Sequence, residues 1–261
     1  MDLGLDGHRA LITGGSRGIG FAVAEALAAE GTAVGLVARD AAGLAAAAER
    51  LRPRGVPVAT AAADVTDTSR LRTAVHDIAT ALGGLEHLVA NAGGTVGRGN
   101  LTSAGDDDFT ATFALNAGHA AELIRAGLPY LRDAGGGSVV IISSITGMRP
   151  APRTAYAAAK AAEIHLAATA AQELAPAGIR VNAVSPGSIM FPGGGWDIFR
   201  QQNPADFASF LATQFPQHRL GTLPEVADVV TFLLSSRASW ITGANVAVDG
   251  GQIYPSARRF D

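Results

Sequence analysis

Short apolar runs alternate along the chain with longer, alanine-rich stretches in which polar residues recur at helical spacing. A strand with little polar alternation is covered on both faces, which is typical of a parallel sheet between two layers of helices. With right-handed crossovers, the pattern predicts an α/β protein with a Rossmann fold: a doubly wound parallel sheet of about seven strands with helices on both faces. The expected strands are residues 10–13, 33–38, 58–63, 87–91, 138–144, 180–185 and 245–250.

The alternation breaks once, over residues 186–223, where "PGSIMFPGGGWD" is followed by the helix-like "FRQQNPADFASFLATQF". A connection of this length predicts a substrate lid. The segment holds five of the ten phenylalanines, and its candidate substrate contacts are Phe191, Trp196 and Phe199. Such a surface favours a fairly large apolar or aromatic carbonyl substrate. Alternatively, the same rings hold the lid to the body or fill a subunit interface.

Composition narrows the classes of function. No linker divides the 261 residues, so we expect a single domain over 1–261. The formal net charge of −3 gives no cationic field for nucleic acid or a membrane surface, and no apolar stretch is long enough to span a bilayer. Without cysteine there can be no disulfide and no metal site with thiolate ligands, and the six histidines lack the spacing typical of metal ligands. We therefore expect a cytoplasmic protein without a metal.

A glycine-rich turn, "TGGSRGIG" over residues 13–20, follows the first expected strand and continues into a helical stretch. Glycines let the backbone approach a phosphate closely, and the N-terminus of a helix favours negative charge. Although the spacing differs from the commoner G-x-G-x-x-G, its place between strand and helix predicts a cradle for the pyrophosphate of a dinucleotide. The candidate cofactor-binding residues here are Gly14, Ser16, Arg17, Gly18, Ile19 and Gly20.

The end of the second expected strand bears on the choice of dinucleotide. An enzyme that prefers NAD usually has a carboxylate here for the ribose 2′-OH. This strand ends in Ala38 and is followed by Arg39. Because guanidinium groups favour a 2′-phosphate and Arg17 can add a second one, we predict NADP(H) rather than NAD(H). In the alternative, Asp40 binds the ribose, although Asp40 could equally cap the next helix.

Two further strand ends carry candidates for the same cofactor. Dinucleotides lie across the carboxyl ends of the strands in such sheets. "ADV" follows the third expected strand and "ANAG" the fourth. We expect Asp64, beside Val65, to meet the adenine amine. The adenosine ribose region is assigned to Asn91, Ala92 and Gly93.

The segment "YAAAK" contains the only lysine of the chain. Tyr156 and Lys160 are four residues apart in a strongly helical stretch, so both project from one face. A nearby ammonium favours the phenolate, which suits Tyr156 to act as general acid to a carbonyl or general base to an alcohol. Upstream, Ser143 and Ser144 end a strand where a substrate oxygen would lie, and Asn116 is a polar residue in an apolar helix that can hold a relay water.

Taken together, "TGGSRGIG", "ANAG", "FALNAG", "VVIISSITG", "YAAAK" and "RVNAVSPG" resemble the short-chain dehydrogenase/reductase family, of the compact one-domain type and like its 3-oxoacyl-[acyl-carrier-protein] reductase members. The resemblance spans nearly the whole chain. It implies a catalytic tetrad of Asn116, Ser144, Tyr156 and Lys160. Ser143 is a rival, since many members place the serine thirteen residues before the tyrosine, but the "SxxG" pattern ending in Gly147 favours Ser144.

The resemblance also implies that Pro186, Gly187 and Ile189 line the nicotinamide side of the cofactor site. After "PG" the family usually has a threonine that binds the carboxamide, and this chain has Phe191 instead. Backbone groups of Ile189 can still bind the carboxamide. The family commonly forms tetramers through the helices that carry the tyrosine and the asparagine, so we expect a homotetramer.

The leading hypothesis is an NADPH-dependent oxidoreductase that interconverts a ketone and a secondary alcohol. One alternative is a 3-oxoacyl-[acyl-carrier-protein] reductase, which would need a basic surface such as Arg98, Arg149 and Arg153 for its acidic partner. An alternative of another class is a non-catalytic dinucleotide-binding sensor or scaffold.

Overall fold

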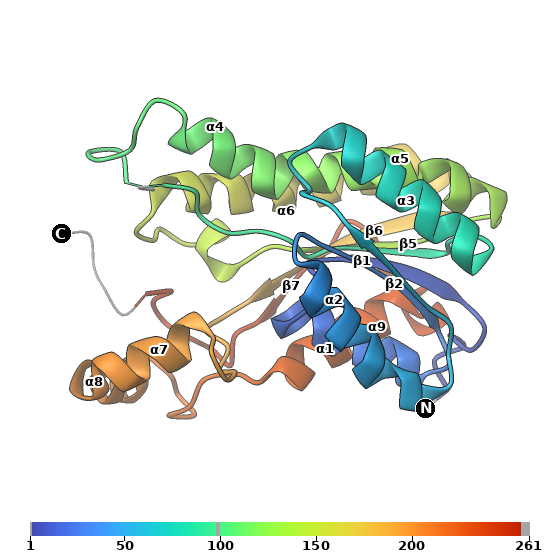
Figure 1. Cartoon of the computed structure of the whole chain (residues 1–261). Coiled ribbons are helices and arrows are strands. Elements are labelled where there is room, and N and C mark those ends of the chain that lie inside the picture. Colours follow the sequence, from blue (N-terminus) through green and yellow to red (C-terminus); the bar gives the residue numbers. More distant parts are fainter. Residues whose placement is uncertain (1, 98–99, 257–261) are drawn as a thin grey trace.

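One parallel sheet organises the molecule in the computed structural model, which describes residues 2–97 and 100–256. In this part of the chain the sheet has seven strands in the order β3-β2-β1-β4-β5-β6-β7, and every pairing is parallel (Figure 1). The doubly wound Rossmann fold expected from the sequence is confirmed. The strands are β1 (Arg9–Thr13), β2 (Ala33–Ala38), β3 (Val58–Ala62), β4 (His87–Ala90), β5 (Gly137–Ile142), β6 (Ile179–Pro186) and β7 (Asn245–Val248).

Helices cover both faces of the sheet (Figure 1). The core on one face joins residues of α1, α2 and α9, and the core on the other joins residues of α3, α5 and α6. The α-helices are α1 (Gly18–Ala29), α2 (Ala41–Leu51), α3 (Thr68–Leu82), α4 (Asp108–Phe113), α5 (His119–Asp133), α6 (Thr154–Leu174), α7 (Gly195–Gln202), α8 (Pro204–Gln214) and α9 (Leu223–Leu234).

The strands lack polar alternation because both of their faces are buried. In β1, Ala10 and Ile12 belong to the core beneath α1 and α9, whereas Leu11 belongs to the opposite core, and all three are fully buried. Strand order reverses at β1, which pairs with β2 on one side and β4 on the other. In open α/β sheets the crevice at such a reversal, at the carboxyl ends of the strands, is where ligands bind.

The long segment between β6 and α9 contains α7 and α8, which lie outside the two helix layers (Figure 1). The single helix-like stretch expected here is divided into two helices, because Pro204 cannot continue a helix and instead begins α8. An isolated bridge between Ile189 and Gly221 ties the start of the segment to its end. No helix in the described residues has the length and apolarity that crossing a membrane requires.

Candidate active site

The glycine turn has the shape that its sequence predicts. Gly14 and Gly18 have φ angles of +66° and +59°, in the region that favours glycine. A Cβ at Gly20 would lie 2.4 Å from the carbonyl oxygen of Gly14, so a side chain there would not fit. Arg17 precedes α1 and makes no side-chain cap, which leaves the first amides of the helix available to an anion. The turn therefore fits a pyrophosphate group.

Arg39 and Asp40 lie at the end of β2, and both side chains are exposed. The Asp40 carboxylate accepts a hydrogen bond from the amide of Ala42 at 3.1 Å and so caps α2. Across the strand end, the backbone N–H of Thr66 is the main cause that lowers the pKa of Asp64, with a smaller contribution from the charge of Arg39. Arg39 and Asp64 thus lie within electrostatic reach of each other, while Asp40 has a structural partner.

Asn91, after β4, is turned toward the glycine turn. Its Nδ2 donates to the carbonyl of Thr13 at 2.9 Å, and its backbone N–H donates to Thr13 Oγ1 at 3.0 Å. The Thr13 hydroxyl also accepts from the amide of Ala92, so its own proton is directed to His119 Nε2, 3.0 Å away. These bonds join the "ANAG" segment to the turn that would hold the dinucleotide.

His119 is a buried partner that the sequence did not point to. Its Nδ1 lies 3.0 Å from the carbonyl oxygens of both Leu115 and Asn116, which identifies Nδ1 as the protonated nitrogen. Burial, followed by the charge of Lys160, lowers the pKa of His119 to about 4. The imidazole is therefore neutral near pH 7.

Asn116 lies in a short π-helical segment, Ala114–Gly118, between α4 and α5, and is fully buried. Its Nδ2 donates to the carbonyls of Gly94 and Thr112, each at 2.7 Å, and its Oδ1 accepts from the amide of Gly94 at 3.1 Å. One lone pair of Oδ1 remains for a water. A Cβ at Gly93 would lie 2.7 Å from this oxygen and 3.0 Å from Lys160 Nζ, so only glycine leaves that space open.

The two adjacent serines have different partners. Ser143 is buried and its hydroxyl donates to the carbonyl of Lys160 at 2.7 Å. Ser144 is partly buried, and its Oγ accepts from the amide of Thr146 at 3.2 Å, which leaves its proton free to bind another oxygen. A Cβ at Gly147 would meet the backbone of Lys160 at 2.6 Å, so this glycine packs the loop against α6. The geometry favours Ser144 over Ser143 as a substrate contact.

Tyr156 and Lys160 share one face of α6, with Lys160 Nζ 5.6 Å from the centre of the Tyr156 ring. Lys160 Nζ donates to the carbonyl of Ile142 at 2.9 Å and forms a buried ion pair with Glu163. Burial by itself lowers the pKa of Lys160, but the charges of Glu163 and Tyr156 outweigh it and raise that pKa. Lys160 is thus held as an ammonium beside the phenol.

A cavity of about 170 Å³ opens among these side chains at the carboxyl ends of the strands. It brings together three of the four tetrad residues with residues of the glycine turn, the "ANAG" segment and the "PG" segment. Asn116 lies next to it, at Gly93, whereas Arg39 and Asp64, from the other two predicted cofactor segments, do not line it. Its lining residues are Ile19, Asn91, Gly93, Ile142, Ser143, Ser144, Tyr156, Lys160, Pro186 and Gly187.

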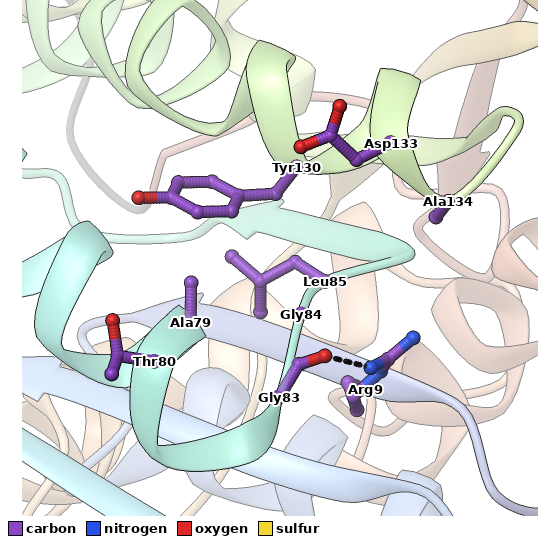
Figure 2. Close-up of a pocket in the computed structure, with 9 residues that line it drawn as sticks. All are labelled: Arg9, Ala79, Thr80, Gly83, Gly84, Leu85, Tyr130, Asp133 and Ala134. Atoms are coloured by element: carbon purple, nitrogen blue, oxygen red, sulfur yellow. Dashed lines mark hydrogen bonds between the residues drawn. The ribbon is translucent and has the colours of Figure 1, made fainter.

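A larger cavity, of about 320 Å³, lies elsewhere, at the opposite edge of the sheet (Figure 2). Figure 2 shows Arg9, at the start of β1, donating to the carbonyl of Gly83, with Tyr130 and Asp133 above them on α5. The Arg9 guanidinium is also paired with Glu86. This cavity contains none of the predicted site residues. The described residues also hold no group of side chains able to bind a metal ion.

The segment between β6 and α9 places Phe191 against the glycine turn: a Cβ at Gly18 would lie 3.5 Å from its ring. Trp196 stacks on Phe210 with ring centres 4.7 Å apart and meets Phe199 edge-to-face at 5.8 Å. The rings of α7 and α8 therefore pack largely against one another. Of the candidate basic surface, Arg149 is paired with Asp249, Arg153 is exposed, and Arg98 lies outside the described residues.

Comparison with known proteins decides the family. The family model described as Enoyl-(Acyl carrier protein) reductase matches residues 14–252. The chain belongs to the short-chain dehydrogenase/reductase family. It is of the family's compact one-domain type and is an enzyme, an oxidoreductase that acts on alcohol and ketone groups.

Relatives differ in what their names say they act on. Galactitol 2-dehydrogenase of Rhizobium johnstonii is 38% identical and covers 95% of both chains, and isoepoxydon dehydrogenase of Penicillium expansum is 33% identical and covers 96% of both. L-sorbose reductase of Gluconobacter frateurii, solved with NADPH and L-sorbose, superposes with a TM-score of 0.90 at 33% identity, covering 97% of this chain and 98% of its own. An NAD⁺-bound xylitol dehydrogenase gives a TM-score of 0.86 at 30% identity, covering 95% of this chain and 99% of its own.

Proposed function

We propose that this short-chain dehydrogenase/reductase reduces a ketone to a secondary alcohol with NADPH and catalyses the reverse reaction when concentrations favour it. The observation that carries the proposal is the cavity in which Ser144, Tyr156 and Lys160 lie beside the glycine turn. The relatives support a nicotinamide dinucleotide, and individual solved structures contain NADPH, NADH or NAD⁺.

The first amides of α1 would hold the pyrophosphate of the dinucleotide, and Pro186, Gly187 and Ile189 would line its nicotinamide side. Asn91, Ala92 and Gly93, with Asp64 and Val65, remain the candidates for the adenosine half. A bound reduced nicotinamide supplies the hydride. Ser16 and Ile19 complete the proposed contacts.

The protein's own groups then handle the substrate oxygen and its proton. Ser144 has a free hydroxyl proton that can bind the carbonyl oxygen and polarise it. Tyr156 donates its phenolic proton to that oxygen as the negative charge develops. Lys160 stabilises the phenolate that remains, and the open lone pair of Asn116 positions a water that returns a proton through Lys160.

Arg39 supports NADPH over NADH because Asp40, its rival for the ribose, is engaged in capping α2. For the substrate, we propose a fairly large apolar ketone. Met148, four residues after Ser144, is 44% exposed, and Ile198 on α7 is 46% exposed, so apolar surface is present on the SxxG loop and on the lid. The acyl-carrier-protein alternative has weaker support because Arg149 is already paired with Asp249.

The test is NADPH consumption across three sets of carbonyl compounds: bulky cyclic or aromatic ketones, ketoses, and 3-oxoacyl thioesters. We expect the bulky apolar ketones to give the highest kcat/KM. Replacing Tyr156 by Phe should reduce kcat by about 10²- to 10⁴-fold, the usual contribution of a general acid, while NADPH still binds. Unchanged turnover of Tyr156→Phe would show that another group is the acid, and activity only with ketoses would overturn the apolar substrate.

A further inference from the structure

A buried carboxylate lies beside the proposed catalytic lysine. Glu163 follows Lys160 by three residues on α6, and the two side chains are only 1% and 3% exposed. The Glu163 Oε2 atom is 2.9 Å from Lys160 Nζ, and Lys160 donates to Oε1 at 3.1 Å. Burying a carboxylate is costly even when it is paired, and nothing in the proposed reaction steps uses this one.

The carboxylate restricts what the ammonium can do. An ammonium has three protons to donate. One is directed to the carbonyl of Ile142 and another to Glu163, which leaves one for the cofactor ribose or the relay water. The carbonyl of Lys160 itself accepts from Ser143, which directly follows β5. The backbone carbonyl and the ammonium group of Lys160 are therefore both held in place, and the remaining N–H of the ammonium has a defined direction.

The carboxylate also changes the charge of the site. Lys160 is paired with the Glu163 carboxylate on α6 and lies beside Tyr156, and His119 on α5 adds no charge near pH 7 because its pKa is about 4. Without Glu163, the phenol and ammonium would form a site with a net positive charge. With Glu163 ionised and paired to Lys160, the site is close to neutral; burial raises the pKa of the Glu163 carboxyl, and the Lys160 ammonium opposes that rise. A nearby negative charge makes it harder for either group of an interacting pair to lose its proton.

We propose that Glu163 is a positioning residue that orients the Lys160 ammonium and keeps the Tyr156–Lys160 pair protonated to higher pH. Ketone reduction needs the pair in that protonated form, whereas alcohol oxidation needs the phenolate. Glu163 thereby widens the alkaline range in which the enzyme reduces ketones. This inference rests on the proposed function, because it concerns the same acid.

The experiment compares kcat/KM for ketone reduction against pH in the wild type, Glu163→Gln and Glu163→Asp. Glutamine has the same shape without the charge, so the alkaline loss of activity should move to lower pH by about one unit. Aspartate keeps the charge and should return the profile toward that of the wild type. Glu173→Gln, an exposed glutamate on the same helix, should leave the profile unchanged.

A second readout needs no turnover. The near-ultraviolet absorbance of the phenolate, taken as the difference between each protein and its Tyr156→Phe counterpart, gives the ionisation of Tyr156 directly. The midpoint should fall in Glu163→Gln by a similar amount. If Glu163→Gln lowers only the melting temperature or kcat while both pH midpoints stay in place, Glu163 is a packing residue and the inference is wrong. If the midpoints shift but the wild type reduces none of the ketones, the proposed function fails and the role of Glu163 stands.

Discussion

Arg39 and Asp40 are adjacent in the sequence and have different tasks in the structure. The Asp40 carboxylate is bonded to the amide of Ala42, while the Arg39 guanidinium is exposed at the end of β2. A carboxylate engaged in capping a helix is a weaker partner for a ribose hydroxyl than a free one. We therefore propose that the choice between NADPH and NADH depends mainly on Arg39.

Replacing Arg39 by Ala should weaken NADPH binding about 10- to 100-fold, the equivalent of one hydrogen bond to a charged group, and should leave NADH binding nearly unchanged. Parallel fluorescence titrations with the two cofactors measure this. Arg54→Ala, at an exposed arginine after α2, serves as the control. Tighter binding of NADH than of NADPH by the wild-type protein would reverse the cofactor assignment.

Individual site residues were predictable where chemistry depends on local spacing. Tyr156 and Lys160 are four residues apart on one helix, so their proximity follows from the helical repeat. Ser144 could be preferred over Ser143 from the glycine three residues later. The pairing of His119 with Thr13 joins residues 106 apart, and no local pattern reveals it. The sequence does contain one indication of the role of Glu163: it is an acidic residue one helical turn from the lysine in an alanine-rich helix.

At the scale of elements, a chain of hydrogen bonds ties β4, β5 and α9 to His8, the residue before β1, at the amino edge of the sheet. Ser138 donates to the carbonyl of Leu234 at 2.8 Å, so it accepts from His87 Nδ1 at 2.9 Å. His87 Nε2 then accepts from His8 Nδ1, also at 2.9 Å. Burial and the neighbouring His8 lower the pKa of His87 to about 3. This series of hydrogen bonds therefore requires a neutral His87, because Nε2 must accept from His8.

This requirement makes stability depend on pH. The unfolded chain protonates His87 and His119 near their ordinary pKa of about 6.5, whereas the folded protein resists protonation until about 3 and 4. The stability that the two neutral histidines contribute to the folded protein is fully present above pH 6.5 and is lost as the pH falls below that value. Each histidine should lower the free energy of unfolding by about 1.4 kcal/mol per pH unit in this window.

Urea unfolding between pH 7 and pH 5 tests this dependence. His87→Gln should reduce the slope of the free energy of unfolding against pH by about half of the two-histidine value, because one of the two groups is removed. The control is His165→Gln, at an exposed histidine on α6, which should leave the slope as in the wild type. A wild-type protein equally stable at both pH values would contradict the argument.

The strands could be located from the sequence because burial on both faces leaves a continuous apolar run. The long segment between β6 and α9 was found as a break in that pattern, but its division into α7 and α8 was not. The sequence left open whether its aromatic residues face a substrate, hold the segment to the body or fill a subunit interface. In the structure Trp196 stacks on Phe210, so part of that apolar surface is used to hold α7 against α8. Sequence patterns show that a side chain is apolar, and only the three-dimensional arrangement shows what it contacts.

For the whole molecule, exposed apolar side chains bear on assembly. Trp240 is 98% exposed and Ile253 is 65% exposed, both near the C-terminal end of the described chain. Large exposed rings are typical of protein contacts, and closed assemblies of identical chains are the commonest kind. We propose a homotetramer in which this surface and the alanine-rich α6 lie at subunit contacts.

Light scattering coupled to size-exclusion chromatography should give the mass of four chains for the wild type. Trp240→Arg should shift the mass toward smaller assemblies, because a charge cannot be buried in an apolar contact without a partner. Leu101→Ser, which changes another exposed apolar residue, should retain the wild-type mass. A wild-type protein with the mass of one chain would rule out the tetramer.

The burial of Lys160 has a consequence for the chemical reactivity of the entire surface. Lys160 is the only lysine, and its side chain is 3% exposed and paired. Acylating reagents and amine-directed cross-linkers therefore meet no lysine amine on the outside of the folded protein. Acylation located at Lys160 by peptide mapping would mean that a reagent had entered the cavity that Lys160 lines.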